Sequence, residues 1–128
     1  MTRDEILAKG PGREMDALVA AEKGISPFTT HDFFGNPHLS YFDDASDGER
    51  SLYNVPHFST KLSAATPLLD EMLSALDAQD RTWVLHRDRD NWAVSELYHD
   101  DLIPIAAGKE APEAIAKAYL IWRGSEND

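Results

Sequence analysis

Residues 24–54 form a long stretch of the chain without any helical periodicity. They contain six of the twelve aromatic residues, and prolines and glycines interrupt them repeatedly. A loop of this length without secondary structure is uncommon in a compact domain. The stretch therefore predicts short strands, one near Leu39–Phe42 and another near Ser51–Val55, with residues 43–50 as the turn between them.

The segments on either side of this stretch favour helices. Thr2 followed by Glu5 has the spacing of a capping box, which indicates a short helix at the start. Apolar residues at helical spacing predict a second helix from about residue 12 to 22, ended by Gly24. The last helix is predicted to begin at Ala111 or Pro112, because proline suits the first helical turn.

The middle of the chain contains two helix-start signals, Ser59-Thr60 and Thr66-Pro67. Proline has no backbone N–H to donate to the carbonyl of Ser63, and its ring clashes there. Two interpretations are therefore open. Either a single helix kinks at Pro67, or Thr66 caps a new helix that continues to about Leu76.

Residues 81–98 predict a β-hairpin whose turn lies at residues 88–91, with Trp92 and Val94 on a buried face. Together these elements predict one α+β domain over residues 1–128. We expect an antiparallel sheet layered with about three main helices, as in an α/β/α-type sandwich. The final helix should stop at Gly124 and leave residues 124–128 as a flexible tail.

Composition limits the classes of function. The 128 residues carry a net charge of −11 and no cysteine, which excludes disulfides and thiolate metal sites. No apolar run suits a signal peptide or a membrane span, so we expect a cytoplasmic protein with no membrane partner. The negative charge disfavours direct contact with nucleic acid. It suits a basic protein partner, or serves solubility alone.

Three segments carry a resemblance to a known family: MTRDEILAKGPGREMDALVA, VPHFSTKLSAA and APEAIAKAYLIW. Together they resemble the phage ABA sandwich family of small phage and prophage proteins. The likeness lies in Gly12 to Asp16, in Phe58 to Thr60 and, loosely, in Pro112 to Ile115. The resemblance implies a layered α/β/α fold and phage ancestry. It implies no catalytic residue.

Residues 24–54 also supply the main candidate binding site. They combine five acidic residues with a single basic one. Buried in a core, Phe33 and Phe34 would be structural. If they are exposed beside Asp32, Asp43 and Asp44, they would form an apolar anchor surrounded by charge, which is an arrangement typical of protein interfaces.

Two further groups invite a chemical interpretation. Arg87 and Arg89, near the predicted hairpin turn, either grip a phosphate or pair with neighbouring carboxylates such as Asp88 and Asp90. The five histidines and nearby acids suggest a small metal-dependent hydrolase, but none has the helical spacing of a known zinc motif. We expect no catalytic residue, metal or cofactor.

These observations favour a non-enzymatic binding protein of phage or prophage origin, acting in the host cell cytoplasm. Its expected role is inhibition of a host defence, through a basic host effector or through sequestration of a small nucleotide signal. Self-association is a further expectation. The alternative is the metal-dependent hydrolase, which a shift of the melting temperature with Zn²⁺ or Mn²⁺ would favour.

Overall fold

The computed structural model describes residues 2–44 and 50–126. Within these ranges the chain forms four helices and two three-stranded antiparallel sheets, which confirms the predicted α+β class. Residues 45–49, which make up most of the predicted turn at 43–50, lie outside the described residues. So do the last two residues of the predicted tail.

The four helices are α1 (Arg3–Ala8), α2 (Arg13–Glu22), α3 (Leu62–Asp77) and α4 (Ala111–Glu126). The predicted cap of α1 is confirmed, because the Thr2 hydroxyl accepts the Glu5 N–H at 3.2 Å. The predicted end of α2 is also confirmed: Gly24 follows it with φ +81°, a left-handed conformation that glycine adopts without strain.

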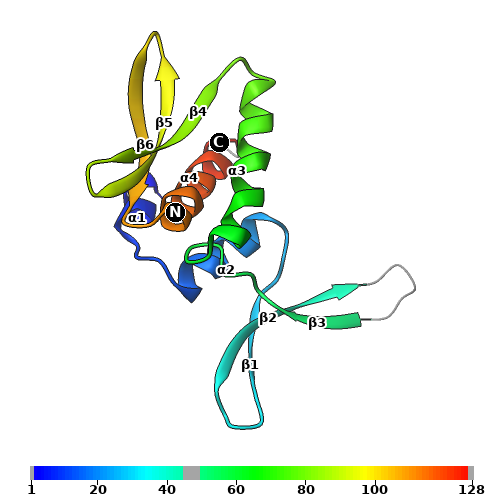
Figure 1. Cartoon of the computed structure of the whole chain (residues 1–128). Helices are drawn as coiled ribbons and strands as arrows, with labels where there is room; N and C mark the ends of the chain where they lie inside the picture. Colours follow the sequence, from blue (N-terminus) through cyan, green and yellow to red (C-terminus); the bar gives the residue numbers. More distant parts are fainter. Residues whose placement is uncertain (1, 45–49, 127–128) are drawn as a thin grey trace.

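Helix α4 lies at the centre of the molecule and contacts α1, α2, α3, β5 and β6 (Figure 1). Its buried residues surround the helix axis, since Ala116, Lys117 and Leu120 are buried as well as Ile115 and Tyr119. A helix that is buried all round must be covered by several elements. The predicted stop at Gly124 is wrong, because α4 continues to Glu126.

Helix α3 is continuous through Pro67, so of the two interpretations drawn from the sequence, the single helix is present and the restart at Thr66 is excluded. Its N-cap residue is Lys61, and the Thr66 hydroxyl donates to the carbonyl of Leu62 at 2.8 Å. One face of α3 is buried, at Ala65, Leu68, Met72 and Leu76. Packing of this face against α4 stabilises the helix despite the missing N–H of proline.

The predicted hairpin is present as β4 (Thr82–Asp88) and β5 (Asn91–Tyr98), and an unpredicted strand β6 (Asp101–Gly108) pairs with β5. Trp83 and Val94 join the hydrophobic core. The prediction that Trp92 is buried is only partly right. Trp92 is half-buried, and the guanidinium of Arg87 lies 5.3 Å from its ring centroid.

The other sheet contains β1 (Phe28–His31), β2 (Pro37–Asp44) and β3 (Arg50–Asn54), in that spatial order. Strands β2 and β3 were predicted, with shorter bounds for β2, whereas β1 was not. Figure 1 shows this sheet extending away from the helices, on the side of the molecule opposite β4–β6. We call residues 28–44 and 50–54 the β-arm.

Candidate functional site: the β-arm and its root

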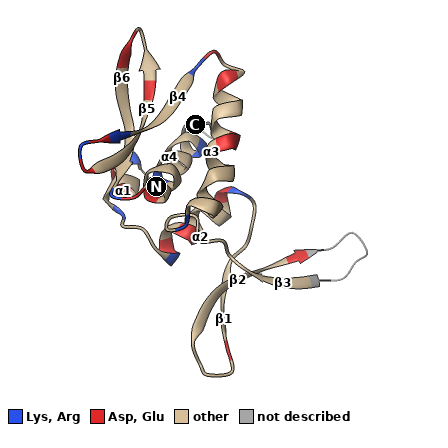
Figure 2. Cartoon of the chain, viewed as in Figure 1, with Lys and Arg blue, Asp and Glu red and all other residues tan. Residues whose placement is uncertain are grey.

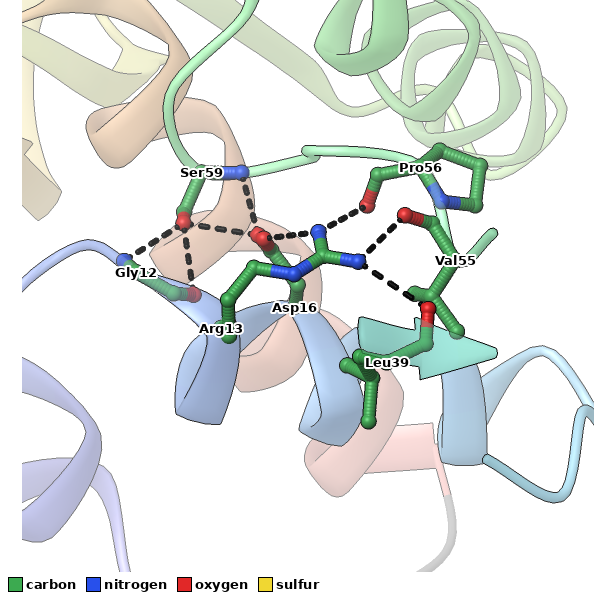
Figure 3. Close-up of polar contacts among 7 residues, drawn as sticks. All are labelled: Gly12, Arg13, Asp16, Leu39, Val55, Pro56 and Ser59. Atoms are coloured by element: carbon green, nitrogen blue, oxygen red, sulfur yellow. Dashed lines mark hydrogen bonds and ion pairs between the residues drawn. The ribbon is translucent and has the colours of Figure 1, made fainter. Parts of the chain in front are cut away.

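The root of the β-arm is held by a buried carboxylate. Asp16 on α2 has no exposed surface. Its Oδ1 accepts the backbone N–H of Ser59 at 2.8 Å and the Ser59 hydroxyl at 2.7 Å. The same hydroxyl accepts the N–H of Gly12 at 2.9 Å (Figure 3). The start of α2 is thereby tied to the segment that leads into α3.

Arg13 extends this network to the arm itself. Its guanidinium donates to Asp16 Oδ2 at 2.8 Å and to the carbonyl of Val55 at 2.7 Å. Longer contacts of 3.3 and 3.4 Å reach the carbonyls of Leu39 and Pro56. Figure 3 shows one side chain bridging α2, β2 and the end of β3. A planar guanidinium with several donors suits this geometry, and an ammonium does not. We call Gly12, Arg13, Asp16 and Ser59 the root cluster.

The root cluster joins two of the segments on which the sequence resemblance rests. Gly12, Arg13 and Asp16 come from the first segment and Ser59 from the second. Ser59 was predicted to cap a helix, and that prediction is wrong, because its hydroxyl is bound to Asp16 instead. Burial, followed by the charge of Arg13, lowers the pKa of His57.

The β-arm exposes apolar side chains on both of its faces. Phe28 and Phe42 contact each other on one face, with ring centroids 5.1 Å apart. Tyr41 and Tyr53 pair across β2 and β3 on the other, at 5.8 Å. About half of the surface of Phe42, Leu52 and Tyr53 remains exposed. Among the described residues, no helix packs extensively on either face of the arm.

The turn between β1 and β2 is ordered by Asp32. Its Oδ1 accepts the N–H groups of Phe34 and Asn36, both at 2.9 Å, and its Oδ2 lies 3.0 Å from His38 Nε2. The hydrogen bond with His38, followed by the one from Asn36, lowers the pKa of Asp32 to about 2. A carboxylate that stays ionised therefore holds the turn over the physiological pH range.

This turn displays the two candidate aromatic residues. Phe33 is 97% exposed and Phe34 is 84% exposed, and their rings meet edge to face at 5.6 Å. Of the two interpretations drawn from the sequence, the buried one is therefore excluded. Two adjacent phenylalanines on an ordered turn form a preorganised apolar tip, which we call the Phe tip.

The structure does not bring all of the candidate residues together. Asp32 lies beside the Phe tip, whereas Asp43 and Asp44 are at the opposite end of β2. Arg87 and Arg89 belong to the β4–β5 hairpin of the other sheet. There, the Arg87 guanidinium lies over Trp92 and makes a long contact of 3.5 Å to the Arg89 carbonyl. The two arginines are therefore not part of the site on the arm.

Several residues of this site were missed in the sequence. The roles of Arg13 and Asp16 depend on Ser59, which lies 43 residues from Asp16, so no local pattern could reveal them. A local signal for the tip did exist: an aspartate followed by Phe34 and Asn36 has the spacing of a side-chain-capped turn. The paired aromatics of β2 and β3 depend on strand register, which the sequence did not provide.

Within the described part of the chain, the histidines and acids do not assemble into a metal site. Among residues 2–44 and 50–126, no group of three His, Asp or Glu side chains is placed to hold a metal ion. His38 is bonded to Asp32, and His86 Nε2 lies 2.9 Å from the Ser95 hydroxyl in the other sheet. The described residues form exposed surfaces suited to binding, and no catalytic group of side chains is assembled among them.

The described helices include none that is both long enough and apolar enough to cross a membrane. Comparison with family models, with curated proteins and with solved structures finds no match for this chain. The candidate function therefore depends on the geometry of the β-arm and on the physical chemistry of its exposed residues.

Proposed function

We propose that this chain is a non-enzymatic binding protein that docks a basic partner protein through its β-arm. The observation that carries the proposal is the Phe tip, two nearly fully exposed phenylalanines at the end of a projecting sheet. Leaving such side chains in water costs roughly 2–3 kcal/mol each relative to burying them. An exposed apolar cluster of this kind is typical of interaction surfaces.

The order of the turn supports binding as well. Asp32 accepts hydrogen bonds from the N–H groups of Phe34 and Asn36, and His38 contacts the other oxygen of its carboxylate. A preorganised anchor loses less conformational entropy when it enters a pocket of the partner. Aromatic anchors in desolvated pockets commonly dominate the free energy of binding.

Charge supports a basic partner. In the described part of the arm, the charged positions that Figure 2 colours are acidic. The chain as a whole has a net charge of −11. Complementary charge accelerates the encounter of two proteins and makes its rate depend on salt. A nucleic-acid partner would be repelled.

The resemblance to phage ABA sandwich proteins supports a phage or prophage context for this binding. In that context the partner is a basic host protein, such as a defence effector. The arm blocks the functional surface of this host protein. Small-nucleotide sequestration has no comparable support, because the described side chains of the arm include no Lys or Arg to bind a phosphate.

The test is an affinity capture from host lysate that compares the parent protein with the double variant Phe33→Ser/Phe34→Ser. The matched control is Leu97→Ser/Leu102→Ser. These two leucines are cross-strand neighbours in the other sheet, and each is about half exposed. The captured protein is then purified, and its affinity for each variant is measured at low and high salt.

We expect a basic protein that binds the parent and the leucine control equally. The tip variant should bind at least about 30-fold more weakly, since one anchor residue alone contributes about 2 kcal/mol or more. Equal binding by all three proteins would contradict the proposal. Sedimentation of the parent protein tests whether a second copy of the chain occupies the arm instead. If the parent is a dimer and the tip variant is a monomer, the arm is a self-association surface and the basic-partner proposal is overturned.

A further inference from the structure

A cleft of about 590 Å³ lies on the body of the molecule. Segments that are distant in the sequence line it: Pro11, Ser59 and Thr60, Asn91, the end of β6, and the first turns of α4. Its size is within the range of small-ligand sites. Ser59 of the root cluster lines this cleft, but none of the β-arm's residues does, so the cleft is separate from the Phe tip.

The cleft contains a carboxylate that has no hydrogen-bond donor among the described residues. The side chain of Glu113, in the first turn of α4, is only 10% exposed. Its nearest charged neighbour is Lys117, at 3.8 Å from Nζ to Oε2, which is beyond hydrogen-bond distance. The carboxylate oxygens of Glu113 are not fully enclosed by protein atoms. The carboxylate is therefore open to the cleft.

The charge of Glu113 is only partly compensated. The Lys117 ammonium donates to the carbonyl of Leu7 at 3.1 Å and is itself nine-tenths buried, so it is held away from Glu113. Lys109 and Glu110 also line the cleft, but both are exposed and their charges are opposite. A buried carboxylate that lacks hydrogen bonds is costly, and a ligand that supplies them is favoured.

Gly108 leaves room for this carboxylate. A methyl group added at Gly108 would overlap the side chain of Glu113, including its carboxyl group. The backbone of residue 108 is not in the left-handed region, so alanine is compatible with its conformation. The absence of a side chain at 108 thus allows Glu113 to lie against β6, where it faces the cleft.

We propose that this cleft binds a small organic cation, a molecule that presents a primary amine or guanidinium group to Glu113. The carboxylate accepts the charged N–H groups, which is a stronger and shorter bond than a neutral one. Thr60 and Asn91 offer further polar atoms at the wall, and Pro11 and Ala107 offer apolar surface for the ligand's carbon chain. The net charge of −11 raises the local concentration of cations.

The experiment is an NMR titration of the full chain with agmatine and with n-butylamine, at a salt concentration that screens surface charge. Amide shifts should change at Thr60, Asn91 and Gly108. Glu113→Gln retains the shape of the side chain and removes its charge, whereas Gly108→Ala displaces the carboxylate without removing it. The matched control is Glu110→Gln, an exposed carboxylate at the same cleft. A parallel titration uses adenosine monophosphate as an anionic probe.

We expect the Glu113→Gln and Gly108→Ala variants to bind agmatine at least tenfold more weakly, and Glu110→Gln to bind it within twofold of the parent. Equal losses for the two glutamate variants would indicate diffuse charge attraction and overturn the proposal. Shifts outside the cleft, or tighter binding of adenosine monophosphate, would overturn it as well. The Phe33→Ser/Phe34→Ser variant should bind agmatine as tightly as the parent protein does. A failure of the cleft proposal can therefore be distinguished from a failure of the proposal for the arm.

Discussion

Asp16 is a buried carboxylate that accepts three hydrogen bonds, two from Ser59 and one from Arg13. Removing it leaves the buried N–H of Ser59 and part of the Arg13 guanidinium without acceptors. We expect Asp16→Ala to lower the free energy of unfolding by about 3–5 kcal/mol, as the loss of one partner of a buried pair does. Chemical denaturation measures this change.

The control lies two residues earlier in the same helix. Glu14 is paired with Lys9 at the surface, and its side chain is 79% exposed. Glu14→Ala should cost less than about 1 kcal/mol, because exposed ion pairs contribute little. Similar losses for Asp16→Ala and Glu14→Ala would show that the root cluster does not stabilise the fold.

Asp32 gives the Phe tip a defined dependence on pH. Its pKa is lowered to about 2, chiefly by the hydrogen bond with His38. Because the pKa in the folded state is below the usual value, the ionised carboxylate stabilises the turn above that usual value. The stabilisation is lost as the pH falls through about 2. NMR titration should show the amide shifts of Phe34 and Asn36 changing near this pH.

The variant His38→Ala removes the largest cause of the shift. In this variant the Asp32 pKa should move back toward the ordinary range, with smaller shifts remaining from the N–H groups of Phe34 and Asn36. His31→Ala is the matched control, since His31 is an exposed histidine on the neighbouring strand. An unchanged Asp32 pKa in His38→Ala would refute the assigned cause.

At the scale of elements, α3 shows how packing overrides a local stop signal. Pro67 lies inside the helix and leaves the Ser63 carbonyl without an N–H partner from residue 67. We expect Pro67→Ala to raise the free energy of unfolding by about 1–2 kcal/mol. This is the difference between the helix penalty of proline and its restriction of the unfolded chain. Thermal and urea denaturation measure it.

Thr66→Ala distinguishes the continuous helix from a restart. Thr66 is exposed, and its hydroxyl donates back to the Leu62 carbonyl within the same helix. The substitution should therefore change stability by less than about 0.5 kcal/mol. A loss of about 1 kcal/mol would instead be the signature of an N-cap and would support a second helix start.

At the scale of the whole molecule, the chain consists of a body with a central helix and an arm with almost no cover (Figure 1). The arm has few buried apolar contacts, so it should open locally at a lower free energy than the body. Native-state hydrogen exchange should show amides of β1–β3 exchanging faster than those of α3, α4 and β5. Uniform protection across both parts would contradict this division.

Arg13→Lys should increase the difference in hydrogen-exchange rate between the arm and the body. Lysine keeps the positive charge but cannot span the carbonyls of Leu39 and Val55 together with Asp16. Exchange in β2 and β3 should then accelerate, with a smaller effect in β4–β6. Arg3→Lys is the matched control, because Arg3 donates to two carbonyls of β6 on the opposite side of the body.

The sequence by itself determined the elements whose signals are local. The Thr2 cap, the end of α2 at Gly24 and the hairpin turn near Arg89 each depend on residues a few positions apart. The α+β class followed from the alternation of helical and non-helical segments. These predictions held because capping, turn formation and periodicity are governed by neighbouring residues.

Only the tertiary structure decided where the elements lie and what they expose. Strand pairing placed β1–β3 in a sheet apart from β4–β6, and α4 is buried on all sides by α1, α2, α3, β5 and β6. The Asp16–Ser59 contact joins residues 43 positions apart. Phe33 and Phe34 are exposed although they are hydrophobic, because they lie on a turn of the arm that projects from the body. Such features depend on long-range contacts, which no local pattern encodes.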